Sequence, residues 1–385
     1  MVRKFSLFLL LISILSFSMG TMVFAEAKKP SIQAKANYVI DYSSGAILTE
    51  DNGNTELALA SLTKLMTVLI VLDQISAGRL HWSDIVTVSK KAEAVNESEI
   101  RLIAGEKITI KELVTGMMVQ SANDAAYALA EKVSGTESKF VALMNQKAKQ
   151  LGLTKTHFYT SNGLIYKSTS GKVYNNYMSA ADIAHLTRIL VATHPEIYTF
   201  SKITHYTFHK GTKREMKVTN TNLMLPTLAY GYKGVDGLKT GYTSAAGYCY
   251  TGTVQRNNFR LIAVVLGSSS VSKRFSDTKK LYDYIYSIYT PRKVLEAGKP
   301  ISSYKTITIQ GHRGPVTIAP LRNLTVPLRN GQERSYTYHI VIYSNLKAPM
   351  KKGTAVGYVQ VYYKGKAVAG TPPISLVTSS NVTKN

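Results

Sequence analysis

Cysteine is almost absent from this chain of 385 residues, in which Cys249 is the only example. A single cysteine excludes any disulfide bond within the chain, so a folded state must be stabilised by its hydrophobic core. Hydrophobic residues make up 45% of the chain, which excludes wholesale disorder, and the length is sufficient for two domains. The residues around Cys249, Gly-Tyr-Cys-Tyr-Thr-Gly, are typical of a strand and predict a buried, apolar role for the thiol.

Acidic residues are also scarce: 23 Asp and Glu stand against 47 Lys and Arg, which gives a net charge of +24. Such a surface favours polyanionic partners. The sequence has no nucleic-acid-binding motif and no basic helix, so we expect no nucleic-acid partner. The basic residues are scattered in pairs such as Lys90-Lys91 and Lys279-Lys280, and a generally solvated surface is the alternative interpretation.

The first 25 residues have the pattern of an export signal. Arg3 and Lys4 precede the apolar run Phe5–Phe17, and Val23-Phe24-Ala25 is a suitable cleavage site before Glu26. We predict a signal peptide over residues 1–25, with an uncleaved membrane anchor as the alternative. The mature chain would carry a charge of +22 once Arg3 and Lys4 are removed. Anionic wall polymers or lipid headgroups are then the expected polyanions, and an extracellular or wall-associated location is the expected one.

Strand patterns at both ends of residues 31–290 enclose a helical region. Two strands are predicted around the turn at residues 43–45, and two more form a hairpin around residues 256–258. The predicted helices cover residues 61–76, 111–120, 123–133, 137–151, 179–192 and 273–289. This order predicts an α/β domain, in which an antiparallel sheet is flanked by helices.

Thr290-Pro291 marks a predicted domain boundary. Beyond it, short strand-like segments and turns predict a small all-β domain over residues 291–378. Residues 379–385 are expected to form a tail. No amphipathic helix is apparent there, so we expect no membrane-anchoring helix at this end.

A serine and a lysine are separated by one helical turn in Ser61-Leu62-Thr63-Lys64. The spacing alone is weak, because four further pairs share it: Ser270/Lys273, Ser276/Lys279, Ser302/Lys305 and Ser344/Lys347. A serine hydroxyl is a poor nucleophile unless a base lies beside it. Lys64 would be such a base only if its pKa lay well below the ordinary value of about 10.4. Burial in an apolar helix and a nearby cation favour that state.

Two more motifs follow in order. Ser121-Ala122-Asn123 lies between two predicted helices, and Lys239-Thr240-Gly241 occurs once, on a predicted edge strand. The ordered set S-x-x-K, S-x-N and K-T-G is the signature of penicillin-recognising serine enzymes. Together with the export signal and the β-rich second domain, these motifs make the chain resemble the serine D-alanyl-D-alanine carboxypeptidases, the low-molecular-weight penicillin-binding proteins.

The resemblance implies a role for each motif residue. Ser61 would attack the substrate carbonyl with Lys64 as base, Ser121 would relay the proton to the leaving amine, and Asn123 would orient Lys64 and the substrate amide. Lys239 would be the second cation and, with Thr240, would bind the terminal carboxylate.

Gly241 would let substrate lie against the strand edge. The backbone N–H groups of Ser61 and Tyr242 would form the oxyanion hole. Stem peptides ending in D-Ala-D-Ala would be the substrates, and β-lactams the covalent inhibitors. Some relatives carry an arginine near Thr221, which this sequence lacks, so that carboxylate contact is in doubt.

Three other functions remain to be weighed. A class A β-lactamase would need a Glu-x-x-x-Asn-type stretch between the second and third motifs, and none of the four glutamates there (Glu131, Glu137, Glu196 and Glu215) has one. A non-catalytic wall-binding protein would not need Ser61, Lys64 and Lys239 intact. His205 and His209 are four residues apart, but no carboxylate stands near them, so we expect no metal and no cofactor.

Overall fold

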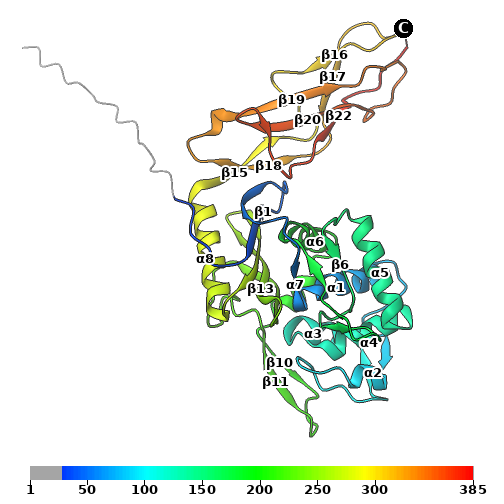
Figure 1. Ribbon diagram of the computed structural model, residues 1–385. Helices are drawn as coiled ribbons and strands as arrows, with labels where there is room; N and C mark the ends of the chain where they lie inside the picture. Colours follow the sequence, from blue (N-terminus) through cyan, green and yellow to red (C-terminus); the bar gives the residue numbers. More distant parts are fainter. Residues whose placement is uncertain (1–27, 385) are drawn as a thin grey trace, which may run out of the picture.

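The computed structural model describes residues 28–384 and shows two domains joined end to end (Figure 1). The predicted signal peptide, residues 1–25, lies outside the described residues. The three sequence motifs, at residues 61–64, 121–123 and 239–241, all lie in the first domain.

A five-stranded antiparallel sheet forms the centre of the first domain, in the order β12-β13-β14-β1-β2. Its strands are β1 (Ala36–Asp41), β2 (Ile47–Asp51), β12 (Val235–Thr243), β13 (Gly247–Arg256) and β14 (Phe259–Ser268). The predicted hairpin around residues 256–258 is confirmed as the β13–β14 turn. The strand β12, which carries the K-T-G motif, lies at the edge of the sheet, as predicted.

Helices cover both faces of this sheet, which confirms the predicted fold class. The helix α8 (Val271–Ile288) packs against β13 and β14 on one face, and α6 (Ala180–Thr193) packs against β1 and β14 on the other (Figure 1). Alternate residues of a strand point to opposite faces. Leu261, Ala263 and Val265 therefore join the core beneath α8, whereas Ile262, Val264 and Leu266 join the larger helical core.

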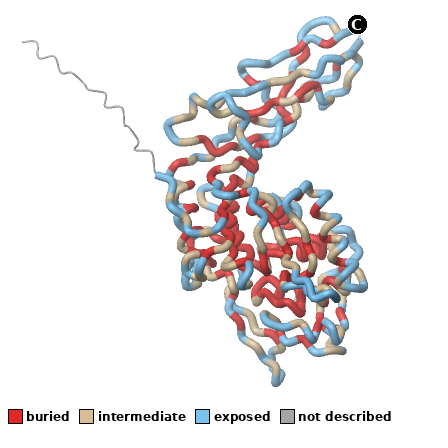
Figure 2. Tube along the Cα trace, in the orientation of Figure 1, coloured by how far each residue is buried: buried red, intermediate tan, exposed pale blue. Residues whose placement is uncertain are grey.

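The larger core is built around α1 (Lys64–Ser76), whose residues from Lys64 to Leu72 are all buried (Figure 2). It contacts α4, α5 and α6, which accounts for its being apolar nearly all round. The other helices of this layer are α2 (Lys90–Glu93), α3 (Ile110–Val119), α4 (Asn123–Ser134), α5 (Glu137–Gln150) and α7 (Ile197–Ser201). The buried Cys249 lies in the same core, as predicted, and burial raises the pKa of its thiol to about 11.

Short strands complete the first domain and pair with one another at its periphery. They are β3 (Leu57–Ala58), β4 (Ile85–Thr87), β5 (Lys107–Thr109), β6 (Thr156–His157), β7 (Tyr166–Lys167), β8 (Val173–Tyr174), β9 (Tyr177–Met178), β10 (His205–Phe208) and β11 (Met216–Thr219). The hairpin of β10 and β11 projects from the body of the domain at the end opposite the second domain (Figure 1).

The second domain consists of strands around its own apolar core. Its strands are β15 (Tyr289–Leu295), β16 (Thr306–Ile307), β17 (Val316–Pro320), β18 (Leu324–Arg329), β19 (Tyr336–Ile342), β20 (Ala355–Tyr363), β21 (Lys366–Ala367) and β22 (Ile374–Thr378). The strand β15 begins immediately after α8 ends. Within the described part of this domain, the only helical segment is the 3-10 turn η2 (Glu333–Ser335).

The prediction that residues 379–385 form a tail is wrong for residues 379–384, which pack on the second domain. Val382 is only 2% exposed and belongs to the core of the second domain. Its backbone exchanges hydrogen bonds with Met350, and Ser379 donates to the carbonyl of Thr317. The sequence conceals this because a single apolar residue among polar ones has no recognisable strand period.

The start of α1 also differs from the prediction of a helix from Ser61. Residues Ala60–Thr63 form a 3-10 turn, η1, and the α-helix begins at Lys64. The turn packs against β12 on one side and against the loop at residues 160–164 on the other. A Cβ on Gly163 would lie 2.0 Å from the carbonyl oxygen of Ala60, so only glycine permits this approach.

Replacing Gly163 with alanine tests how much the fold depends on this contact. Gly163→Ala should lower the free energy of unfolding by about 3 kcal/mol, because the methyl group displaces the turn and the backbone is left-handed (φ +94°). Gly171→Ala is the matched control, since its φ is +80° but no atom lies within 4 Å. The control should lose only about 1 kcal/mol, the cost of a left-handed backbone at a residue with a Cβ. Equal losses in urea denaturation would refute the steric explanation.

Candidate active site

Lys64 is the most heavily buried charged group beside the predicted nucleophile. Its side chain is 0% exposed, and its Nζ lies 2.8 Å from the Oγ of Ser61. The same nitrogen donates to the Oδ1 of Asn123 at 2.7 Å and to the carbonyl oxygen of Asn162 at 2.7 Å. Three oxygens therefore surround the amine, and each comes from a different part of the chain.

The surroundings of Lys64 favour its neutral form. Burial, reinforced by the positive charge of Lys239, holds the pKa of Lys64 well below its ordinary value. The carboxylates of Asp124 and Glu97 act in the opposite direction but are weaker influences. The carboxylate of Asp124 already accepts hydrogen bonds from the backbone N–H groups of Ile100, Leu102 and Ala125.

Ser121 lies in the turn between α3 and α4, and Asn123 is the first residue of α4. Ser121 has a left-handed backbone (φ +64°), a conformation that non-glycine residues adopt mainly where surrounding contacts enforce it. The Nδ2 of Asn123 donates to the carbonyl oxygen of Asn96 at 2.9 Å, which fixes its Oδ1 toward Lys64. Among the described residues, the Ser121 hydroxyl has no hydrogen-bond partner, so it is free to engage a bound molecule.

Lys239 is buried behind the edge strand rather than on the cavity wall. It is 1% exposed, and its Nζ donates to the carbonyl oxygen of Thr240 at 3.0 Å. Burial, with the nearby guanidinium of Arg274, lowers the pKa of Lys239 to about 7. The group that faces the cavity at this point of β12 is Thr240.

Gly241 lies directly against the turn η1, and the expectation that it also lets substrate lie against the strand edge stays a prediction. A Cβ there would lie 2.9 Å from the carbonyl oxygen of Leu59 and 3.1 Å from the backbone nitrogen of Ser61. The missing side chain therefore lets the turn η1 lie directly on β12. This contact also brings the Ser61 N–H beside the strand, one residue before Tyr242.

A cavity of about 480 Å³ brings these groups together. Its walls carry Ser61, Ser121 and Asn123 from the helical layer, and Thr240 to Thr243 from β12. Lys64 and Lys239 lie behind these walls. Six of the predicted site residues therefore border one cavity, with both lysines in contact with its lining.

Arg274 is a lining residue that the sequence analysis missed. It lies in the first turn of α8, is 5% exposed, and donates to the carbonyl oxygens of Gly241 (3.4 Å) and Cys249 (3.3 Å). Arg274 and Thr221 border the same cavity. That Arg274 reaches this cavity is apparent only from the sheet topology, because a long β-hairpin separates it from the K-T-G motif in the chain. The one signal in the sequence was an arginine on the apolar side of the helix at residues 271–288.

The histidines do not form a metal site in the described chain. His205 is exposed, whereas the Nε2 of His209 lies 2.6 Å from the carbonyl oxygen of Ile100. Within residues 28–384, no group of three or more His, Cys, Asp or Glu side chains is arranged to bind a metal ion.

Each of the two domains matches a known protein family. Residues 23–270 match the family described as D-alanyl-D-alanine carboxypeptidase, and residues 289–384 match the C-terminal domain of penicillin-binding protein 5. The "D-alanyl-D-alanine carboxypeptidase DacF" of Bacillus subtilis is 31% identical over 382 residues, which covers 97% of this chain and 93% of that protein.

Solved structures agree with this assignment. Penicillin-binding protein 5 from Haemophilus influenzae superposes with a TM-score of 0.79 at 31% identity, covering 93% of this chain and 99% of that one. Penicillin-binding protein D2 from Listeria monocytogenes, in its ampicillin-bound form, is 32% identical with a TM-score of 0.58, covering 67% and 98% respectively. This chain therefore belongs to the serine D-alanyl-D-alanine carboxypeptidases, the low-molecular-weight penicillin-binding proteins.

Proposed function

We propose that this enzyme is exported and removes the terminal D-alanine from peptidoglycan stem peptides ending in D-Ala-D-Ala, through an acyl-enzyme on Ser61. The observation that carries this proposal is the environment of Lys64 Nζ, which lies 2.8 Å from the Ser61 hydroxyl. The roles given below to the other site residues are part of the same proposal.

The hydrogen-bond partners of Lys64 are compatible with a neutral amine, which is the form that burial favours. An ammonium group has three N–H donors and no acceptor, whereas a neutral amine has two N–H donors and one lone pair. The carbonyl oxygens of Asn123 and Asn162 can only accept, so they take the two N–H groups. The lone pair is then left to accept the O–H of Ser61. This arrangement is the one that a general base requires.

In the acylation step, Ser61 Oγ bonds to the carbonyl carbon of the penultimate D-alanine as its proton passes to Lys64. The N–H groups of Ser61 and Tyr242 stabilise the oxyanion. The C–N bond to the terminal D-alanine then breaks, and the proton moves from Lys64 through Ser121 to the leaving nitrogen. Water later hydrolyses the ester, which regenerates Ser61.

The terminal carboxylate would bind between Thr240 and Arg274, which border the same cavity. Arg274 supplies the guanidinium that the sequence lacks near Thr221. Lys239 lies behind Thr240, and an arriving carboxylate would favour its protonated form despite the pKa of about 7 in the free enzyme. A charged Lys239 in turn favours neutral Lys64, so substrate binding and base activation support each other.

β-Lactams would acylate the same serine. The relative from Listeria monocytogenes has been solved in ampicillin-bound form, and we propose covalent binding for this chain as well. A secreted β-lactamase would release the adduct rapidly, and a non-catalytic wall-binding protein would form none.

Replacing the nucleophile tests this proposal. Ser61→Ala should abolish covalent labelling by a fluorescent penicillin, because the oxygen that forms the ester is gone. Ser344→Ala is the matched control, since Ser344 belongs to another Ser-x-x-Lys pair but is exposed in the second domain. Labelling that survives in Ser61→Ala would overturn the assignment, and rapid loss of the adduct in the unmodified enzyme would indicate a β-lactamase.

The rate of penicillin acylation should depend on pH through Lys64. Burial and Lys239 lower the pKa of Lys64, so the neutral base is present above that pKa and is lost as the pH falls through it. We expect a decline on the acidic side and near-complete inactivity in Lys64→Arg, whose guanidinium stays protonated. A flat profile between about pH 5 and 9 would contradict a lysine base.

The surface charge supports association with anionic wall polymers after export. Residues 291–384 carry 14 Lys and Arg but only two Asp and Glu, so the second domain contributes much of the positive charge. Among the described residues, no helix is both long and apolar enough to cross a membrane.

Cell fractionation tests this location. An electrostatic attachment is screened within about 8 Å at physiological ionic strength. The protein should therefore leave the wall fraction in concentrated salt without detergent. Retention in salt-washed membranes would instead indicate that the segment Phe5–Phe17 anchors an uncleaved chain, and would refute both export with cleavage and loose attachment to the wall.

A further inference from the structure

The turn η1 is strained at the residue directly before the predicted nucleophile. Ala60 has a left-handed backbone (φ +48°). A residue with a side chain keeps this conformation only where the surrounding structure enforces it. Since Ser61 follows immediately, the contacts that hold Ala60 in this conformation also fix where the Ser61 hydroxyl lies.

Two buried side chains, Thr63 and Asn176, hold this turn. The hydroxyl of Thr63 donates to the carbonyl oxygen of Ala60 at 2.8 Å, which closes the turn. The same hydroxyl accepts from the Nδ2 of Asn176 at 2.9 Å, and this bond directs the hydroxyl proton toward Ala60. The backbone carbonyl of Asn176 also accepts from the N–H of Leu59 at 3.2 Å, where the chain enters the turn. Thr63 is 0% exposed and Asn176 is 2% exposed, so water does not compete for these bonds.

The remaining hydrogen bonds of the Asn176 side chain hold the loop at residues 160–164. Its Oδ1 accepts from the N–H groups of Tyr159 at 2.6 Å and Thr160 at 3.1 Å. Its Nδ2 also donates to the carbonyl oxygen of Thr160 at 2.9 Å. A side-chain amide has two N–H donors and two acceptor lone pairs, and all four are used here. The whole hydrogen-bonding capacity of this amide therefore serves to join the turn to the loop.

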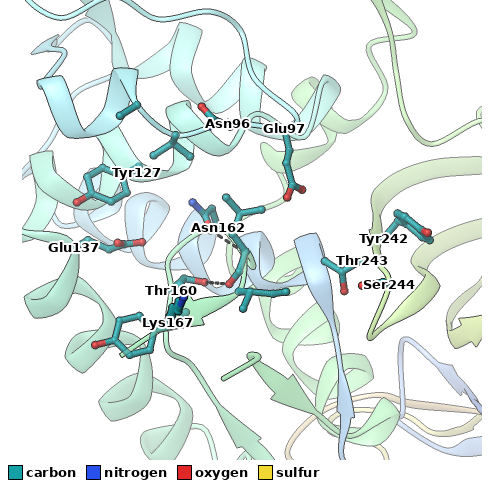
Figure 3. Close-up of a pocket in the computed structure, with 15 residues that line it drawn as sticks. Asn96, Glu97, Tyr127, Glu137, Thr160, Asn162, Lys167, Tyr242, Thr243 and Ser244 are labelled. Atoms are coloured by element: carbon teal, nitrogen blue, oxygen red, sulfur yellow. Dashed lines mark hydrogen bonds between the residues drawn. The ribbon is translucent and has the colours of Figure 1, made fainter. Parts of the chain in front are cut away.

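Thr160 connects Asn176 to the carbonyl oxygen that accepts from Lys64. The Oγ1 of Thr160 donates to the carbonyl oxygen of Leu164 at 3.0 Å, and the Oδ1 of Asn162 accepts from the N–H of Leu164 at 2.9 Å (Figure 3). These bonds close the loop on itself. Its Asn162 carbonyl oxygen then lies 2.7 Å from the Nζ of Lys64.

The turn and the loop thus meet at Lys64, one bringing Ser61 and the other bringing the Asn162 carbonyl. Asn176 does not border the catalytic cavity. We infer that Asn176 is a positioning residue, which sets the place of Ser61 relative to the loop that holds Lys64 Nζ. The inference rests on the proposed acylation of Ser61. A displacement of about 1 Å between reacting groups can lower a rate by about 100-fold.

Replacing Asn176 with aspartate removes only half of its hydrogen bonds. The carboxylate still accepts from the N–H groups of Tyr159 and Thr160, but it cannot donate to Thr63 or to the Thr160 carbonyl oxygen. With Nα,Nε-diacetyl-L-Lys-D-Ala-D-Ala as substrate, kcat should fall by about 10- to 100-fold in Asn176→Asp. KM should change by less than about twofold, because Asn176 does not border the cavity. Unchanged kcat would overturn the inference alone, whereas failure of the unmodified enzyme to cleave this peptide would overturn the proposed function as well.

Asn145→Asp is the matched control for lost stability. Asn145 Oδ1 accepts from the N–H of Phe158, and its Nδ2 donates to the carbonyl oxygens of Phe158 and Val141. The substitution therefore removes the same kind of bond beside the same loop, but none of these bonds reaches the turn η1. Asn145→Asp should lower the Tm yet leave kcat within about twofold. A fall in kcat equal to that in Asn176→Asp would show that lost stability, not positioning, lowers the rate.

Thr63→Val tests the same connection from the side of the turn. Valine has nearly the shape of threonine but lacks the hydroxyl, so it breaks the bonds to Asn176 and Ala60 and leaves Asn176 bound to the loop. We expect a lower kcat with KM unchanged. Thr63→Ser retains the hydroxyl and should keep kcat within about threefold of the unmodified enzyme. Equal kcat values in Thr63→Val and Thr63→Ser would contradict the positioning role.

Discussion

The proposed catalytic site depends on the burial of an amine beside a serine. A lysine side chain with no exposure is stable as a cation only where anionic partners compensate it, and the direct partners of Lys64 are neutral oxygens. Lys239 adds a repulsive charge from the edge strand. Burial, together with the guanidinium of Arg274, lowers the pKa of Lys239 to about 7, whereas a neutral Lys64 exerts no repulsion on it. Because both burial and Lys239 lower the pKa of Lys64, we propose that Lys64 is the amine that gives up its proton.

The fold provides the three surfaces that create this environment. The helix α1 buries Lys64 within the helical core, the loop at residues 160–164 supplies the carbonyl oxygen of Asn162, and β12 brings Lys239. The turn that holds Ser61 is confined between the loop at residues 160–164 and β12, with Gly163 on one side and Gly241 on the other. Because each glycine permits a backbone contact that a methyl group would prevent, the position of the serine follows from packing rather than from a helix cap.

The sequence predicts the parts of this site whose signals are local. The three motifs identify Ser61, Lys64, Ser121, Asn123 and the segment Lys239–Gly241, and strand and helix periods predict the sheet, its flanking helices and the edge position of β12. What it cannot predict arises where segments distant in the chain meet. The role of the Asn162 carbonyl cannot be recognised in the sequence, because every residue has a carbonyl group. Arg274 reaches the cavity only through the sheet topology. Val382 appeared to belong to a tail because strand pairing at Met350 leaves no pattern in so short a segment.

Direct titration of Lys64 tests the central claim that this amine is neutral in the working enzyme. Lysine labelled with ¹³C at Cε reports protonation by NMR, and the signal of Lys64 is assigned by its loss in Lys64→Arg. Lys64 should titrate well below the ordinary value of about 10.4. Its pKa should rise in Lys239→Gln, because a repulsive charge has been removed. Titration of Lys64 near the ordinary value, or no response to the loss of Lys239, would contradict the account.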